Sequence, residues 1–272
     1  MFNPFKILSY LKFYQSETKI EEEPTIIENL STEEKEKVKQ LLKQKREEEL
    51  SNPPTIAIIG KTGVGKSSTI NNLFKTNLDV SHSQSCTQKG TPIKLTNGKG
   101  EIIIYDMPGL GEDEDKDEEH KKEYRKILPQ CDVVLWIMNI ADREMSSQQR
   151  YIREILTYLD GKLVICANKA DNIHPENWNI SYNMPSNEQH EILENRIKDI
   201  RSKLCKIIPD LKEELIVYYS ATKRFKLNDL FGAMLEACPN DREWVMNERI
   251  DIEDFKELIA PEILKKLNND KI

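Results

Sequence analysis

A glycine-rich octapeptide at residues 60–67, GKTGVGKS, matches the pattern G-x-x-x-x-G-K-[ST]. Glycines in such a loop let backbone N–H groups converge on phosphate oxygens without a clash from a Cβ atom. The ammonium of Lys66 supplies a point charge to the β- and γ-phosphates, and the hydroxyl of Ser67 is a ligand for Mg²⁺. The sequence therefore predicts a nucleotide-phosphate site that consists of Gly60, Lys61, Thr62, Gly63, Val64, Gly65, Lys66, Ser67 and Ser68.

A second polar cluster, Asn168-Lys169-Ala170-Asp171, follows the apolar run KLVICAN. The carboxylate of Asp171 can accept hydrogen bonds from N1–H and the 2-amino group of guanine, and adenine offers neither donor. The stem of Lys169 can lie over the base, and Asn168 can tie this loop to the phosphate loop. A solvated turn is the alternative for such a tetrapeptide alone, but its place downstream of a phosphate loop favours a guanine site.

Two further loops complete the predicted site. The sequence DMPG at residues 106–109 ends an apolar strand. Asp106 can hold Mg²⁺ through water, and the N–H of Gly109 can sense a γ-phosphate, because only glycine lets the backbone approach so closely. The tripeptide Ser220-Ala221-Thr222 ends the last predicted strand, where the N–H of Ala221 can meet guanine O6.

The polar loop at residues 76–91 must supply a threonine for Mg²⁺ and the γ-phosphate. We expect Thr87 in this role, with Thr91 as the alternative. The predicted metal ligands are then Ser67, Thr87 and Asp106. The residues predicted to act on the transferred phosphate are Lys66, Thr87 and Gly109.

Strands alternating with helices must position these loops. Short apolar runs predict strands, and amphipathic stretches between them predict helices; the strands are expected at 55–60, 91–96, 101–106, 133–140, 162–168 and 214–221. The helices are expected at 31–49, 66–74, 118–128, 146–159, 188–208, 227–237 and over most of 241–267. This alternation is typical of an α/β fold with a mostly parallel six-stranded sheet and helices on both faces. The dipeptide Asn97-Gly98 predicts a hairpin between 91–96 and 101–106, so we expect the second strand to be antiparallel.

The order of the five motifs resembles that of translation-factor-class P-loop GTPases of the Era-like branch. The motifs are GKTGVGKS, Thr87, DMPG, NKAD and SAT. The chain is similar to small stand-alone bacterial GTPases labelled 50S ribosome-binding GTPase, and immunity-related GTPases and septins share its style of phosphate loop. The resemblance implies GTP, GDP and Mg²⁺ as ligands. It covers about residues 55–238, which leaves helical extensions at 1–54 and 239–272.

The resemblance also bears on hydrolysis. Ras-like enzymes orient water with a Gln just after the DMPG-type glycine, where this chain has Leu110. Some related enzymes use K⁺ held by an Asn at the position of Gly63, which offers no side chain. Three interpretations remain open: a slow switch with an external activator, a homodimer that completes the site across its nucleotide domains, and a GTP binder with negligible turnover.

Composition limits the partners. Lys and Arg number 40 against 47 Asp and Glu, a net charge of −7, which argues against direct nucleic-acid binding. Five widely spaced cysteines predict neither disulfides nor a metal site and fit the cytoplasm. No apolar run approaches the ~18 residues of a membrane span. The apolar residues 1–15 either dock on the body of the protein or contact a membrane or an unidentified protein effector.

Several features invite over-interpretation. Residues 112–119 hold seven acidic side chains in eight, and we expect a solvated, mobile segment rather than a metal site. The four histidines show no ligand spacing, which predicts surface roles. Trp136 is expected in the core, whereas Trp178 and Tyr182 lie in a loop suited equally to local packing or to a partner. A nucleotide-dependent assembly or membrane-associated GTPase with negligible turnover is the rival to a soluble switch.

Overall fold

The computed structural model describes residues 31–74, 91–97, 100–109, 114–159, 161–239 and 242–249 of the chain. Its strands form one sheet in the order β2-β3-β1-β4-β5-β6. They are β1 (Thr55–Gly60), β2 (Thr91–Asn97), β3 (Gly100–Asp106), β4 (Val133–Asn139), β5 (Leu163–Asn168) and β6 (Ile216–Tyr218). Every neighbouring pair is parallel except the antiparallel pair of β2 and β3. The predicted sheet is confirmed.

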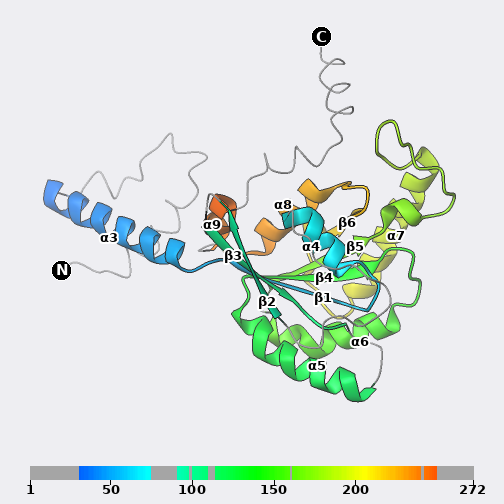
Figure 1. Cartoon of the computed structure of the whole chain (residues 1–272), viewed down its shortest axis with the longest axis horizontal. Helices are drawn as coiled ribbons and strands as arrows, with labels where there is room; N and C mark the ends of the chain where they lie inside the picture. The colour runs from blue at the N-terminus through cyan, green and yellow to red at the C-terminus, as the bar shows by residue number, and fades with distance from the viewer. Residues whose placement is uncertain are drawn as a thin grey trace, which may run out of the picture.

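Helices cover both faces of this sheet. Helices α5 and α6 lie on one face, and α4, α8 and α9 lie on the other (Figure 1). The helices are α3 (Thr32–Ser51), α4 (Lys66–Phe74), α5 (Glu114–Ile127), α6 (Ser146–Ile155), α7 (Asn187–Leu204), α8 (Leu227–Ala237) and α9 (Glu243–Arg249). Short 3₁₀ turns follow α5 at Leu128–Gln130 and α6 at Leu156–Tyr158, and others lie at Ala170–Asn172 and Glu213–Leu215.

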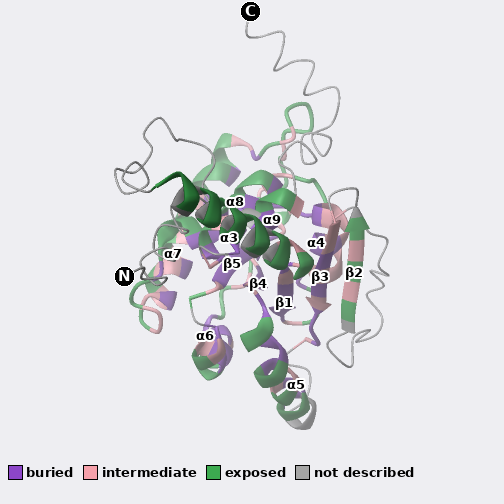
Figure 2. Ribbon diagram, turned by 90° about the vertical axis from the view of Figure 1, so that its left-hand side faces the viewer, coloured by how far each residue is buried: buried purple, intermediate pink, exposed green. Residues whose placement is uncertain are grey.

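The central strands are buried from both sides, as their unbroken apolar sequences predict. All six residues Val133–Met138 of β4 are 0% exposed, and the strands β1, β4 and β5 are drawn as buried in Figure 2. Trp136 is in the core, as predicted, and its Nε1 donates to Oε1 of Gln148 on α6 at 2.9 Å. The last strand is shorter than predicted, because only Ile216–Tyr218 pair with β5.

The acidic segment departs most from the prediction. Residues 114–119 belong to α5 rather than to a mobile loop. Asp117 is only 6% exposed and accepts a hydrogen bond from the Tyr151 hydroxyl at 2.7 Å. The reason is the spacing of Asp117, His120, Tyr124 and Ile127, which places these four buried residues on one face of the helix.

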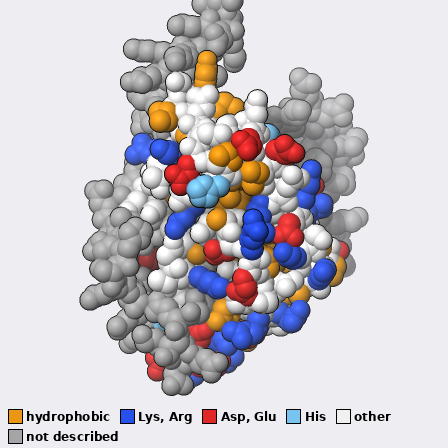
Figure 3. Space-filling view, turned by 90° about the vertical axis from the view of Figure 1, so that its right-hand side faces the viewer, with side chains coloured by type: hydrophobic (Ala, Val, Ile, Leu, Met, Phe, Trp, Pro, Cys, Tyr) orange, Lys and Arg blue, Asp and Glu red, His pale blue; other side chains and the backbone are white. Residues whose placement is uncertain are grey.

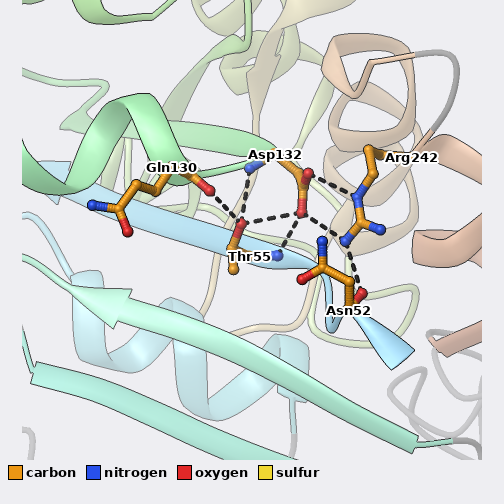
Figure 4. Close-up of polar contacts among 5 residues, drawn as sticks. All are labelled: Asn52, Thr55, Gln130, Asp132 and Arg242. Carbon is orange, nitrogen blue, oxygen red and sulfur yellow. Dashed lines mark hydrogen bonds and ion pairs between the residues drawn. The ribbon is translucent and has the colours of Figure 1, made fainter. Parts of the chain in front are cut away.

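The described parts of the two predicted extensions are in contact where α3 ends and α9 begins and ends. Helix α3 extends away from the sheet (Figure 1), and these contacts lie at its C-terminal end. There Arg249 Nη2 donates to Leu50 O at 2.6 Å, and Arg242 Nη2 donates to Asn52 O at 2.9 Å. Arg242 also pairs with Asp132, with 3.0 Å between Nε and Oδ1 (Figure 4).

Helix α9 contributes to the core. Val245 and Met246 of α9 are 0% exposed. The helix predicted for most of 241–267 is therefore observed as Glu243–Arg249, and the remainder lies outside the described residues. In the described ranges no helix has the length and the apolar character needed to cross a bilayer.

Parallel pairing brings the predicted loops to one edge of the sheet. Asp106, at the end of β3, lies beside Ile58 of β1, two residues before Gly60. Asn168, at the end of β5, lies beside Asn139 at the end of β4. The phosphate loop, DMPG and NKAD thus share the carboxyl edge, where open α/β sheets bind their ligands.

Candidate nucleotide-binding site

The phosphate loop joins β1 to α4, as the sequence predicts. Gly60, Gly63 and Gly65 have φ angles of +146°, +78° and +96°, a region that disfavours residues with a Cβ atom. A Cβ on Gly60 would lie 2.1 Å from Ile137 O, and one on Gly65 would lie 2.4 Å from Asn168 Nδ2. These two glycines are therefore required both by backbone conformation and by close approach.

Lysine side chains lie against the carbonyls of this loop. Lys66 Nζ donates to Gly60 O at 3.2 Å and to Lys61 O at 3.3 Å. From the opposite loop, Lys169 Nζ donates to Gly63 O at 2.7 Å. Two ammonium groups are thus held at a loop whose helix N-terminus already carries partial positive charge, an arrangement suited to anions.

Asn168 is the residue that connects the loops of the site. It is 2% exposed, and its Nδ2 donates to Val64 O at 2.9 Å. Its Oδ1 accepts from Lys169 N at 2.7 Å and from Ala221 N at 3.0 Å. One amide therefore bonds to the phosphate loop, to NKAD and to the loop containing Ala221. In this structure the Ala221 N–H, expected to meet guanine O6, is directed to Asn168 instead.

The residues around Asn168 adopt a conformation that few side chains allow. Lys169 has a φ of +66°, in the left-handed region, and the 3₁₀ turn that follows contains Asp171, which is partly exposed. Ala170 N donates to Tyr219 O at 3.1 Å, which fixes this turn to the end of β6. The carboxylate of Asp171 is therefore carried on a short turn that is bonded to the segment after β6.

The Ser220–Thr222 loop is ordered by its own hydrogen bonds. Ser220 is 0% exposed, and its Oγ accepts from Lys223 N at 2.9 Å. The backbone N–H groups of Ser220 and Phe225 each donate to the carbonyl of the other residue, at 3.1 and 3.0 Å. Thr222 is exposed at the surface. Hydrogen bonds within the loop therefore fix its backbone.

The hydroxyl of Tyr219 is a contact that the sequence analysis missed. Tyr219 is 0% exposed, and its hydroxyl is 2.7 Å from Thr69 Oγ1, which itself donates to Gly65 O. Burial raises the pKa of Tyr219 well above its usual range, so the phenol stays neutral. The aromatic residue next to Ser220 thus supports the first turn after the phosphate loop.

The DMPG loop lies between the phosphate loop and α5. Asp106 is 8% exposed, and Met107 N donates to Ile58 O at 3.0 Å. A Cβ on Gly109 would lie 2.4 Å from Thr62 Oγ1 and 3.0 Å from Thr62 N. Gly109 therefore packs directly on the phosphate loop, at a distance that only glycine permits.

His120 contradicts the prediction that the histidines have surface roles. It is 9% exposed, and its Nδ1 lies 2.8 Å from Gly109 O. Tyr124, one turn further along α5, donates its hydroxyl to Pro108 O at 2.6 Å. The acidic residues before His120 concealed the helical spacing that would have identified this buried face.

Glu144 contacts the phosphate loop from the start of α6. Its carboxylate lies 3.5 Å from Lys61 Nζ and accepts hydrogen bonds from the Ser146 hydroxyl and from the N–H and hydroxyl of Ser147. These hydrogen bonds lower the pKa of Glu144 to about 2. Glu144 is therefore ionised at neutral pH and both caps α6 and pairs with Lys61.

The remaining predicted residues divide between described and undescribed parts of the chain. Thr87 and Leu110 lie outside the described residues. The alternative to Thr87, Thr91, is the first residue of β2 and pairs in register with Asp106. Ser67 and Ser68 lie in the first turn of α4. The structure thus brings the phosphate loop, Asp106 and Gly109 together with Asn168 and the base-side loops.

The long loop after NKAD both packs locally and exposes apolar side chains. Trp178 stacks edge-on against Phe225, with ring centroids 5.1 Å apart, and Asn183 Nδ2 donates to Lys223 O at 2.8 Å. Ile180 is 81% exposed and Tyr182 is 53% exposed. Hydrophobic side chains gather in the upper part of the face drawn in Figure 3. Local packing, one of the two alternatives, is therefore observed for Trp178.

Comparison with known proteins finds relatives of the part of the chain that contains the phosphate loop. Residues 55–169 match the family described as 50S ribosome-binding GTPase. YfjP of Escherichia coli (strain K12) is 32% identical over 146 residues, which are 53% of this chain and 50% of YfjP. GTPase Era of Treponema denticola is 25% identical over 190 residues, which are 69% of this chain and 58% of Era. The chain thus spans about half the length of these curated relatives.

Solved structures show the same fold. Era from Aquifex aeolicus, in a variant bound to GDP.AlF4-, has a TM-score of 0.54 and 24% identity, covering 68% of this chain and 56% of that chain. A dimerization-deficient mutant of Toc33 from Arabidopsis thaliana has a TM-score of 0.51 and 20% identity, covering 87% of this chain and 97% of that chain. Residues 55–169 are therefore similar to the 50S ribosome-binding GTPase family and to Era, and the described part of the chain has the fold of the Era-like P-loop GTPases.

Proposed function

We propose that this chain binds GTP and GDP, hydrolyses GTP to GDP and phosphate with Mg²⁺, and acts as a conformational switch. The observation that carries the proposal is the set of three hydrogen bonds made by the buried amide of Asn168. They hold the phosphate loop beside the two loops predicted to read the base. A nucleotide lying across these loops would be bound at both of its ends.

Base selection is assigned to Asp171. Its carboxylate would accept two hydrogen bonds from guanine, and an adenine base would leave it without them. A site that is built to bond donors of its substrate discriminates strongly against analogues that lack those donors. We expect GDP to bind at least about 100-fold more tightly than ADP in calorimetric titrations. Similar dissociation constants for GDP and ADP would contradict the proposal.

The residues available for Mg²⁺ are the hard oxygen donors that this ion prefers. Ser67 is the second residue of α4, and Asp106 reaches the same edge of the sheet from β3. We propose that they hold Mg²⁺ together with Thr87, which lies outside the described residues. When bound, Mg²⁺ would neutralise charge on the β- and γ-phosphates.

Catalytic roles are proposed for three residues. The ammonium of Lys66 would exchange the carbonyls of Gly60 and Lys61 for phosphate oxygens, and the N–H of Gly109 would contact the γ-phosphate. Thr87 would complete the γ-phosphate contacts. Leu110 cannot polarise water, so these three residues would supply positioning and charge rather than a water-orienting group. We therefore propose a low intrinsic rate.

We propose that dimerisation across the nucleotide domains raises this rate. Leu110 and Gly63 offer neither a glutamine nor a ligand for K⁺, and the similarly folded Toc33 has a mutant described as dimerization-deficient. Specific GTPase activity should rise as protein concentration increases from nanomolar to tens of micromolar. A constant specific activity over this range would argue for an external activator. No measurable activity at any concentration would indicate a GTP binder.

A membrane-associated or assembly GTPase is the second candidate function. Its support is the apolar sequence of residues 1–15, which lie outside the described residues. Co-sedimentation with anionic liposomes, for the full chain and for a variant lacking residues 1–15, would separate it from a soluble switch. Binding that requires these residues would favour the membrane role.

The proposed organisation is a nucleotide domain at 55–238 with helical additions at 1–54 and 239–272. Residue Met246 packs in the hydrophobic core of the domain, so the second addition is anchored at its start. We place the protein in the cytoplasm, in agreement with the free state of Cys131, Cys166, Cys205 and Cys238.

A further inference from the structure

Two side chains of α5 hold consecutive peptide groups of the DMPG loop. The hydroxyl of Tyr124 donates to Pro108 O at 2.6 Å, and His120 Nδ1 lies 2.8 Å from Gly109 O. The two residues are four positions apart, so they lie on the same face of the helix. Tyr124 is 0% exposed and His120 is 9% exposed. Both hydrogen bonds are therefore largely shielded from water.

The first of these bonds controls the direction of a neighbouring N–H. The carbonyl of Pro108 and the N–H of Gly109 belong to one peptide group. This group is trans, because the cis peptide bond among the described residues is the one between His174 and Pro175. In a planar trans peptide the C=O and the N–H point in opposite directions. A carbonyl directed at Tyr124 on α5 thus turns the Gly109 N–H away from α5.

The Gly109 peptide lies against the loop expected to bind phosphates. A Cβ on Gly109 would lie 2.4 Å from Thr62 Oγ1. The phosphate loop is therefore in direct contact with Gly109, while α5 contacts the carbonyl groups of Pro108 and Gly109. Turning the Gly109 N–H away from α5 presents it to the ligand side of the loop.

The donors in both bonds follow from chemistry. A carbonyl oxygen only accepts, so His120 carries a proton on Nδ1. Burial, with smaller effects of Asp117 and Asp106, raises the pKa of Tyr124 far above its usual range, so its hydroxyl stays protonated. The hydroxyl therefore remains a hydrogen-bond donor at neutral pH.

We propose that Tyr124 and His120 are positioning residues that hold the Gly109 peptide in the orientation that binds a γ-phosphate. The inference rests on the proposed function, because it assumes a GTP ligand. GDP has no γ-phosphate and does not use this N–H. Loss of either hydrogen bond to the DMPG loop should therefore lower the affinity for GTP and leave the affinity for GDP unchanged.

The test compares affinities for GDP and a non-hydrolysable GTP analogue. Tyr124→Phe and His120→Ala should each lower the affinity for the GTP analogue about 3- to 10-fold, which is the effect of losing one hydrogen bond. The affinity for GDP should change by less than about twofold. Unchanged GDP affinity also shows that the variants fold. A merely structural role would affect both nucleotides alike.

Tyr151→Phe is the matched control. Tyr151 lies on α6, and its buried hydroxyl donates to Asp117 of α5, the helix that carries Tyr124 and His120, at 2.7 Å. The substitution removes this hydrogen bond and leaves the two bonds to the DMPG loop in place. Its ratio of analogue to GDP affinity should equal that of the wild type. Equal ratios in Tyr124→Phe and wild type, or the same selective loss in Tyr151→Phe, would overturn the inference. Failure of the wild type to bind GDP would instead overturn the proposed function.

Discussion

Replacement of Asn168 with alanine should disturb both the fold and the site, because one buried amide joins three loops. The substitution removes the bonds to Val64 O, Lys169 N and Ala221 N, of 2.9, 2.7 and 3.0 Å. Val64 and Ala221 are 3% and 1% exposed, so water cannot easily replace the lost partner. The loops would then separate without any change at the residues that contact a ligand.

The magnitude follows from the number of bonds. At about 1 kcal/mol for each intramolecular hydrogen bond, Asn168→Ala should lower the free energy of unfolding by about 3 kcal/mol. For a domain of this size, a loss of that magnitude lowers the melting temperature by about 6–12 °C. Affinities for GDP and for a GTP analogue should fall together, since the phosphate loop serves both.

Thermal unfolding and calorimetric titration of the same samples measure these effects. Asn139→Ala is the matched control, because Asn139 is the neighbour of Asn168 on β4 and its Oδ1 accepts one bond, from Ala141 N. It should cost no more than about 1 kcal/mol. Equal destabilisation by the two substitutions, or unchanged nucleotide affinity in Asn168→Ala, would refute the linking role of Asn168.

Three further predictions follow from glycine, ion-pair and carboxylate contacts. Gly65→Ala should abolish nucleotide binding in calorimetric titrations, because its φ is +96° and the Cβ would clash with a neighbouring amide. Gly232→Ala, where a Cβ would meet no atom within 4 Å, should stabilise α8 by about 0.5–1 kcal/mol in thermal unfolding. Arg242→Ala leaves Asp132 largely buried without its guanidinium partner and should lower the free energy of unfolding by about 3 kcal/mol in urea. Since hydrogen bonds lower the pKa of Glu144 to about 2, its stabilisation is complete above about pH 5 and is lost as pH falls toward 2, so urea midpoints of Glu144→Gln and wild type should converge on acidification.

Loops that carry recognisable chemistry were predictable, because glycine and strand-end patterns restrict both backbone and ligand. The apolar strands also predicted the parallel sheet. The contacts between segments that are far apart in the sequence were not predicted. Asp117, His120 and Tyr124 form a buried helical face, but the surrounding charges resemble a solvated segment. Burial at such positions is decided by tertiary packing, which local composition does not report.

The contacts of the terminal segments were likewise beyond sequence reasoning. Arg242 and Arg249 bond to carbonyls near the end of α3, about 190 residues earlier in the chain. Nothing in the spacing of either arginine specifies such a partner. Gly100 shows the same effect, because a Cβ there would lie 1.6 Å from Arg249 Nη1.

The claim that Asp171 reads a guanine base is tested most directly by exchanging its carboxylate for an amide. Asn at this position can donate to the 2-carbonyl of xanthine but no longer accepts both guanine donors. In calorimetric titrations of wild type and Asp171→Asn, we predict that the affinity for GDP falls at least about 100-fold in the variant. The affinity for xanthosine diphosphate (XDP) should rise. Wild-type GDP affinity in the variant, with no gain for XDP, would contradict the assignment of this site to guanine nucleotides.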